Sequence, residues 1–135
     1  MTHQATIISF ANHKGGVGKT TTTASVGSIL ASLGKKVLLV DMDAQSNLTS
    51  SLLKNEEVEF TIYDALSASC RGAAYNLAVY PIAENLDIVP SSLRLASADL
   101  ELSSVMAREH LLSDVLQSQV TNYDYILIDC PPSLG

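Results

Sequence analysis

The chain has 135 residues, which is enough for one domain with a single hydrophobic core. Hydrophobic residues make up 47% of it and charged residues 16%, a balance that excludes a disordered chain. No apolar run approaches the roughly eighteen residues of a membrane span, and no basic region followed by an apolar core marks a signal peptide. The composition therefore predicts a cytoplasmic domain.

The net charge of −6 is unevenly distributed along the chain. Residues 1–54 carry five lysines and two aspartates, a balance of +3, whereas residues 55–135 carry three arginines and twelve acids, a balance of −9. Nothing in this distribution is typical of a basic stripe that binds nucleic acid.

Apolar runs alternate with helical patterns, which predicts a parallel sheet flanked by helices. Nearly continuous apolar runs, typical of strands that are covered on both faces, occur at about residues 5–11, 36–41, 86–90 and 124–129.

The first helix is expected over residues 19–33, where Gly34 supplies a left-handed stop. Thr61 should cap a short helix that runs through Ser67, with Asp64 at its favourable third position. Two further helices are predicted, with a blurred pattern over residues 93–103 and a clearer one over 108–119.

The most informative segment follows the first predicted strand. Its glycines let the backbone turn tightly and bring N–H groups close to phosphate oxygens at the start of a helix. Lys19 can reach the β- and γ-phosphates of a nucleotide, and the Thr20 hydroxyl can bind Mg²⁺. The usual pattern has a glycine at position 13, where this chain has His13, followed by a second lysine. The segment is therefore a variant phosphate-binding loop, composed of Lys14, Gly15, Gly16, Val17, Gly18, Lys19, Thr20 and Thr21.

Three aspartates end predicted strands, at the sheet edge where ligands of open α/β folds bind. Asp129 ends the last strand, where its carboxylate can order Mg²⁺ through water. Asp41 and Asp43 end the second strand, two residues apart, and in an extended segment they would point the same way. That arrangement suits two acids near one metal ion and one water molecule. The alternative, that all three are ordinary loop or surface carboxylates, remains open.

Together these segments resemble the motifs of the ParA/Soj/MinD family of ATPases. Residues 14–21 are similar to its deviant Walker A motif, residues 37–47 to its second, aspartate-bearing motif, and residues 125–133 to its Walker B strand and the following switch. The resemblance implies an α/β, P-loop NTPase-like fold with a mostly parallel sheet. It also implies a Mg-ATPase of the partition type, with ATP and Mg²⁺ as cofactors.

The resemblance also implies roles for individual residues. In the family, the lysine that matches Lys14 crosses a dimer interface and contacts the partner subunit's nucleotide phosphates. Lys19 is implied to neutralise charge on the transferred phosphoryl group, and Asp43 to position the attacking water. The implied metal site consists of Thr20, Asp41 and Asp129, with Asp41 supporting the metal shell.

For partners, the resemblance implies an ATP-dependent homodimer, a ParB-like protein that stimulates hydrolysis, and non-specific DNA for the full-length protein. The implied location is the cytoplasm, in association with the nucleoid, and no membrane is expected. Two alternatives remain open. One is a MinD-like ATPase that positions division sites, and the other is a nucleotide-binding module that does not hydrolyse ATP.

This chain departs from the family pattern in two respects. Ala44 and Ser46 occupy positions where the family usually has proline and glycine, and family members are longer. We therefore expect residues 1–135 to be the N-terminal part of a single ParA-type nucleotide-binding domain, truncated after the Walker B strand. In that case the first strand is an uncovered edge that contains Ile7, Ile8 and Phe10.

Overall fold

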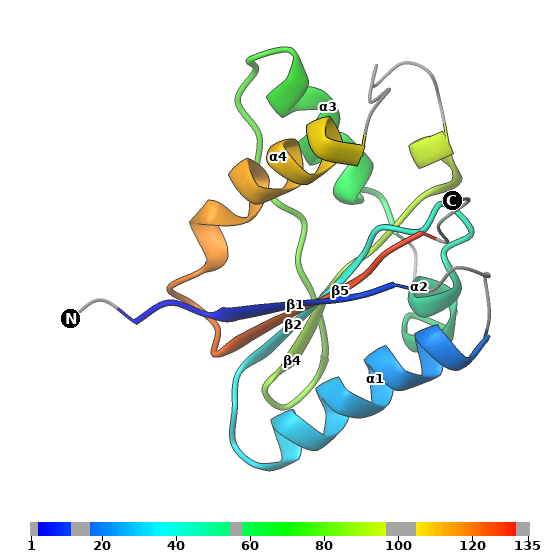
Figure 1. Ribbon diagram of the computed structural model, residues 1–135, viewed down its shortest axis with the longest axis vertical. Helices are drawn as coiled ribbons and strands as arrows, with labels where there is room; N and C mark the ends of the chain where they lie inside the picture. Colours follow the sequence, from blue (N-terminus) through cyan, green and yellow to red (C-terminus); the bar gives the residue numbers. More distant parts are fainter. Residues whose placement is uncertain (1–2, 12–16, 55–57, 97–104, 132–135) are drawn as a thin grey trace.

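The computed structural model describes residues 3–11, 17–54, 58–96 and 105–131. A five-stranded sheet lies at the centre of the described part, in the order β1-β5-β2-β4-β3 (Figure 1). Its strands are β1 (Thr6–Phe10), β2 (Val37–Asp41), β3 (Tyr80–Ala83), β4 (Leu86–Val89) and β5 (Tyr125–Asp129). The pairs β1–β5, β5–β2 and β2–β4 are parallel, and β3 runs antiparallel to β4. The predicted, mostly parallel sheet is confirmed.

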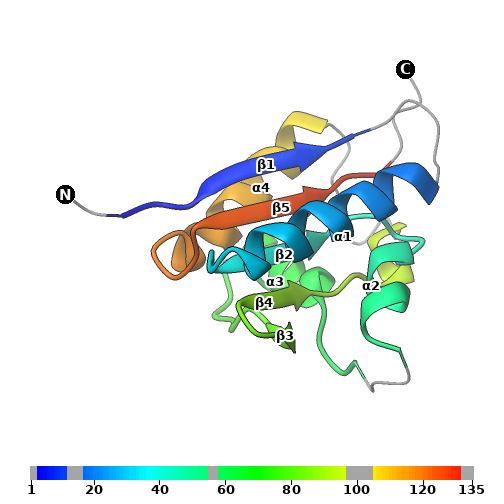
Figure 2. The same ribbon diagram turned by 90° about the horizontal axis from the view of Figure 1, so that it is seen from below.

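Helices cover both faces of this sheet (Figure 2). One face carries α1 (Val17–Ser32) and α2 (Asn47–Leu52), and the other carries α3 (Ile62–Cys70) and α4 (Val105–Leu116). The described residues also contain two short 3₁₀ helices, η1 (Leu93–Ala96) and η3 (Gln117–Gln119).

The central strand β2 shows why the core lies on both sides of the sheet. All of its residues are buried, and their side chains alternate between the two faces. Leu38 and Val40 belong to the core under α3 and α4, whereas Val37 and Leu39 belong to the core under α1 and α2. The continuous apolar run in the sequence thus corresponds to a strand without a solvent-facing side.

Helix α1 approaches the sheet closely at Gly27. A Cβ atom at this position would lie 2.8 Å from Cδ2 of Leu39 and 3.5 Å from Cδ1 of Leu86. Since Cβ atoms essentially never approach another atom as closely as 2.8 Å, the absence of a side chain at Gly27 lets α1 pack this closely on β2.

The structure confirms the residues predicted to end the first helix and to cap α3. Gly34 adopts a φ of +86° just after α1, as the left-handed stop requires. The Thr61 hydroxyl accepts a hydrogen bond from Tyr63 N, and the Asp64 carboxylate accepts one from Thr61 N, which forms a capping box. Helix α3 runs on to Cys70, beyond the predicted end at Ser67.

Other elements differ from the prediction. Helix α2 was not predicted, because six residues are too few to show a helical period. Strand β3 was not predicted either, since Pro81 argues against a central strand; the sheet accommodates it at the edge. Of the helix expected over residues 93–103, the described part is only the single turn η1.

Strand β1 is an open edge of the sheet within the described residues, as Figure 2 shows. It pairs with β5 on one side, and Ile7 and Ile8 are 46% and 36% exposed. Phe10 is half-buried and packs on the core under α1. The expected uncovered edge strand is thereby confirmed for the part of the chain that is described.

Candidate functional site

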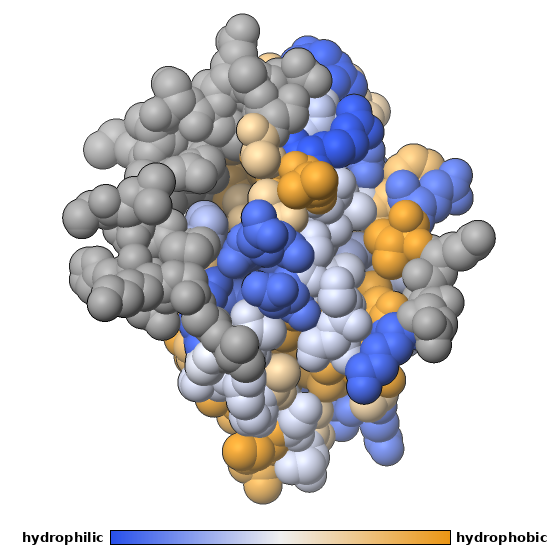
Figure 3. Space-filling model, turned by 90° about the vertical axis from the view of Figure 1, so that its right-hand side faces the viewer, coloured by the Kyte–Doolittle hydropathy of each residue, from blue (hydrophilic) through white to orange (hydrophobic). Residues whose placement is uncertain are grey.

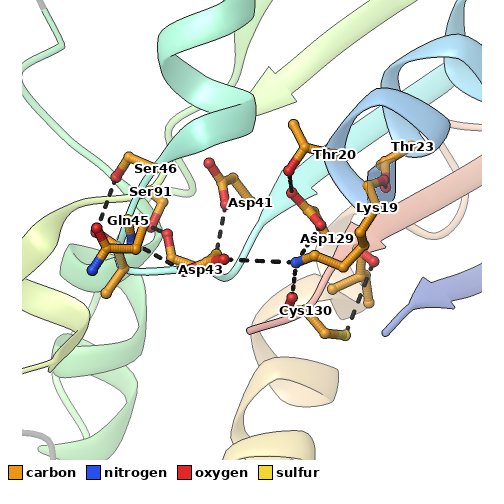
Figure 4. A network of polar contacts seen from close by, with 12 residues as sticks. Lys19, Thr20, Thr23, Asp41, Asp43, Gln45, Ser46, Ser91, Asp129 and Cys130 are labelled. Atoms are coloured by element: carbon orange, nitrogen blue, oxygen red, sulfur yellow. Dashed lines mark hydrogen bonds and ion pairs between the residues drawn. The ribbon is translucent and has the colours of Figure 1, made fainter. Parts of the chain in front are cut away.

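The candidate site lies where the parallel strands end and α1 begins. In the sheet register, Asp129 is opposite Phe10 on one side and Asp41 on the other, so three strands end at the same level. The parallel strands place their carboxyl ends at one edge, and this edge receives ligands in open α/β folds. Figure 4 shows the polar side chains that meet there.

Lys19 is at the centre of the site, in the first turns of α1. Its side chain is 3% exposed, and its ammonium nitrogen lies 2.7 Å from Asp129 Oδ1 and 3.6 Å from Asp43 Oδ2 (Figure 4). It also donates a hydrogen bond to the backbone carbonyl of Cys130. Two carboxylates therefore compensate the buried cation. Three residues that the sequence singled out separately come together at this point.

Thr20 and Asp129 form the part of the site that suits a metal ion. The Thr20 hydroxyl donates to Asp129 Oδ2 over 3.1 Å, and Asp129 is fully buried. Asp129 Oδ1 touches the Lys19 ammonium but accepts no hydrogen bond of good geometry from the described residues. Hydroxyl and carboxylate oxygens are the ligands that Mg²⁺ prefers.

The protein supplies only part of a coordination shell there. Among the described residues, no three histidine, cysteine, aspartate or glutamate side chains are grouped so that they could hold a metal ion by themselves. Since Mg²⁺ usually keeps several waters and takes its other ligands from one or two carboxylates and from phosphates, Thr20 and Asp129 fit such an ion.

Asp43 follows β2 and is 6% exposed. Its Oδ1 accepts a hydrogen bond from Gln45 N over 3.0 Å, and its Oδ2 faces Lys19. Its own backbone N–H donates to Asp41 Oδ1 over 3.0 Å, so the chain turns here instead of continuing as an extended strand. The two carboxylates consequently have different hydrogen-bond partners, and the expectation that they point the same way stays a prediction.

Asp41 is fully buried and bound within the protein. Its Oδ2 accepts hydrogen bonds from Thr49 N over 2.9 Å and from the Thr49 hydroxyl over 2.7 Å. Burial raises the pKa of Asp41 from 3.8 to about 6, although the hydrogen bonds from Thr49 and Asp43 act in the opposite direction. Its role in a metal shell stays a prediction.

Two residues that hydrogen-bond to Asp41 and Asp43 were not predicted from the sequence. Thr49, in the first turn of α2, accepts a hydrogen bond from Ser91 N over 2.8 Å. Ser91 follows β4, and its hydroxyl donates to Asp43 O over 2.7 Å. The position of Ser91 just after a strand is a signal that could have identified it, whereas no sequence pattern marks Thr49.

The phosphate loop is described only in its second half. Lys14, Gly15 and Gly16 lie outside the described residues, and the backbone of Val17 begins α1. Gly18 and Thr21 lie in the first turns of α1. The first turn holds no acidic residue, and the N–H groups and the dipole at a helix N-terminus favour an anion at this end.

The side of the molecule that carries the site is of mixed polarity. Figure 3 looks onto this side, where hydrophilic and hydrophobic residues are interspersed and the centre is hydrophilic. No helix in the described ranges combines the length and apolar character needed to cross a bilayer.

Comparisons with known proteins identify similar sequences and structures. The sequence model of the AAA domain family matches residues 5–135. The chain is 46% identical over 130 residues to the sporulation initiation inhibitor protein Soj of Bacillus subtilis. This alignment covers 96% of this chain and 51% of that protein. The chain thus spans about half the length of this curated relative.

Two solved structures have the same fold. A plasmid partition protein from Borrelia burgdorferi superimposes with a TM-score of 0.78 and 32% identity, covering 96% of this chain and 57% of that one. Cobyrinic acid a,c-diamide synthase from Mycobacterium smegmatis, crystallised with an ATP analogue and magnesium, gives a TM-score of 0.80 and 36% identity. That match covers 97% of this chain and 53% of the synthase.

Proposed function

This chain belongs to the AAA domain family, within the ParA/Soj/MinD group of P-loop ATPases, and we propose that it binds Mg-ATP and hydrolyses it in plasmid or chromosome partition. The observation that carries the proposal is the convergence of Lys19, Thr20, Asp43 and Asp129 at the N-terminus of α1. A buried lysine beside a hydroxyl and two carboxylates, at a helix N-terminus, is the set of groups that phosphoryl transfer requires.

Each residue has a distinct task in the proposed reaction. The N–H groups from Gly15 to Thr20 and the Lys19 ammonium hold the phosphates, and Thr20 and Asp129 hold Mg²⁺. Bound Mg²⁺ neutralises charge on the phosphates. Asp43 stands 3.6 Å from the Lys19 ammonium, so its carboxylate lies where it can orient a water molecule toward the phosphate that Lys19 contacts.

The proposal also covers dimerisation and partner binding, which are activities of the full-length protein. In the proposal, Lys14 reaches across an ATP-dependent homodimer to the partner's nucleotide, as a cation supplied in trans. A ParB-like partner stimulates hydrolysis, and non-specific DNA binds the dimer, which places the protein in the cytoplasm at the nucleoid. This part of the proposal is supported by the similarity of the chain to Soj and to a plasmid partition protein.

The domain assignment is part of the same proposal. Residues 1–135 are the N-terminal part of a larger single nucleotide-binding domain. Two observations support this: the chain spans about half of its relatives, and Ile7 and Ile8 are exposed on the open edge strand β1. A longer protein would cover that edge.

The test is phosphate release from Mg-ATP by the chain and by Asp43→Asn. The amide keeps the shape of Asp43 and its bond from Gln45 N, but it lacks the negative charge. We expect the variant to bind Mg-ATP and to release phosphate about 100-fold more slowly. Equal rates of release would contradict hydrolysis at this site, and retained binding would then favour the non-hydrolysing module.

A further inference from the structure

The loop that carries Asp43 is closed by a ring of hydrogen bonds from separate parts of the chain. Asp43 N donates to Asp41 Oδ1 over 3.0 Å, and the Thr49 hydroxyl donates to Asp41 Oδ2 over 2.7 Å. Ser91 N donates to the Thr49 hydroxyl over 2.8 Å, and the Ser91 hydroxyl donates to Asp43 O over 2.7 Å. The ring therefore begins and ends on the backbone of Asp43.

This closure fixes Asp43 on both sides of its Cα atom. Its N–H is held by Asp41 and its carbonyl by Ser91, so the ring restrains the backbone from which its side chain extends. The members are 0–8% exposed, a setting in which satisfied hydrogen bonds rigidify a site. The carboxylate that the ring supports faces Lys19 with Oδ2.

Within the described residues, the two hydroxyls make no contact with the residues of the proposed phosphate and metal site other than through Asp41 and Asp43. In Figure 4, Ser91 lies on the side of Asp43 opposite to Lys19. Thr49 comes from α2 and Ser91 from the segment after β4, and neither residue contacts Lys19, Thr20 or Asp129 in the described contacts. Within the described contacts, Ser91 reaches the site through the backbone carbonyl of Asp43, and Thr49 reaches it through Asp41, whose other oxygen holds Asp43 N.

We propose that Thr49 and Ser91 are positioning residues that hold Asp43 in the geometry required for hydrolysis. The proposal rests on the function proposed above. Phosphate binding depends on Lys19 and the start of α1, so the loss of either hydroxyl should lower kcat and leave KM for Mg-ATP almost unchanged.

The first pair of variants is Ser91→Ala and its neighbour Ser92→Ala. Ser91→Ala removes only the bond to Asp43 O, whereas the Ser92 hydroxyl accepts from Arg94 N outside the ring. We expect Ser91→Ala to lower kcat about 10- to 100-fold with KM within about twofold, because small misplacements of a catalytic group have effects of this size. Ser92→Ala should match the wild type.

The second pair is Thr49→Val and Thr49→Ser. Valine has the same shape but no hydroxyl, and serine restores it. We expect Thr49→Val to lower kcat like Ser91→Ala, and Thr49→Ser to retain it. A kcat in Ser91→Ala equal to that of Ser92→Ala would overturn the proposal, even if Thr49→Val fails to fold.

Amide hydrogen exchange provides a readout that does not depend on activity. Protection of the Asp43 and Gln45 N–H groups should fall in Ser91→Ala and persist in Ser92→Ala. If the wild type releases no phosphate, the proposed function fails. The exchange measurement then decides the positioning proposal by itself, since unchanged protection in Ser91→Ala would overturn it.

Discussion

Ser46 has a backbone conformation that its side chain disfavours. Its φ of 59° and ψ of 32° lie in the left-handed region, and as the N-cap of α2 it makes no side-chain cap hydrogen bond. This conformation destabilises the folded state by about 1–2 kcal/mol when the residue is not glycine. Glycine would remove that strain, but it also raises the conformational entropy of the unfolded chain, which offsets part of the gain. The related motif usually has glycine at this position, so the sequence departs from it at a strained residue.

We expect Ser46→Gly to raise the free energy of unfolding by about 0.5–1 kcal/mol, measured by urea denaturation. Ser50→Gly, at an exposed position inside α2, is the control and should lower it by about 0.5–1 kcal/mol. Destabilisation by Ser46→Gly would show that the left-handed conformation is not strained.

Asp41 makes the stability of the protein depend on pH. Its pKa is about 6 in the folded state and near 3.8 when unfolded, so the folded state binds more protons here between these values. The contribution of Asp41 to stability therefore falls as the pH rises from about 4 to about 6, by up to about 3 kcal/mol.

The comparison with Asp41→Asn isolates this contribution. We expect the wild-type free energy of unfolding, minus that of the variant, to fall over the same pH range in urea titrations without metal ion or nucleotide. A difference that stays constant from pH 4 to 7 would contradict the raised pKa.

The residues of the proposed phosphate and metal site could be predicted from the sequence, because they follow one another closely or end apolar strands. Lys19, Thr20 and Asp129 were identified this way, and the structure brings them together. Ser91 was not predicted, because it is 48 positions away from Asp43 in the sequence. The hydrogen bond between them forms because β2 pairs with β4.

At the scale of elements, the packing of α1 depends on one small residue. Gly27→Val would place methyl groups where even a Cβ is 2.8 Å from Leu39, which is fully buried. We expect a loss of about 1–3 kcal/mol in the free energy of unfolding, because overpacking a core forces side chains and backbone to shift.

Ser28→Val is the matched control, since it introduces the same side chain at the next position of α1, which is exposed. It should change stability by less than about 1 kcal/mol, through helix propensity alone. Equal losses in both variants would show that α1 does not require close contact with β2.

The sequence predicts long, strongly periodic or continuously apolar elements better than short ones. Strands β2, β4 and β5 were predicted within about one residue, because burial on both faces demands apolar residues throughout. Helix α2 has six residues and is positioned by Thr49 and Leu48, whose burial is a tertiary effect.

At the scale of the whole molecule, the open edge of β1 should make the 135-residue chain self-associate. An exposed strand edge with apolar side chains is a template for pairing. We expect sedimentation velocity to show concentration-dependent association that Ile7→Lys reduces.

Leu93→Lys is the control for that experiment, because it places a lysine at another exposed apolar residue, on η1. A purely monomeric wild type, or an equal effect of Leu93→Lys, would contradict association through β1.

The most direct test of the central claim, that these residues form a phosphate site, is the thermal unfolding of the chain with and without Mg-ATP. Lys19→Met, which keeps the length of the side chain and removes its charge, is measured in the same way. Ligand at a hundred times its dissociation constant adds about 2.7 kcal/mol of stability, or about 10 °C for a domain of this size. We predict such a shift for the wild type and its loss in Lys19→Met; the same shift in both proteins, or none in the wild type, would contradict the claim.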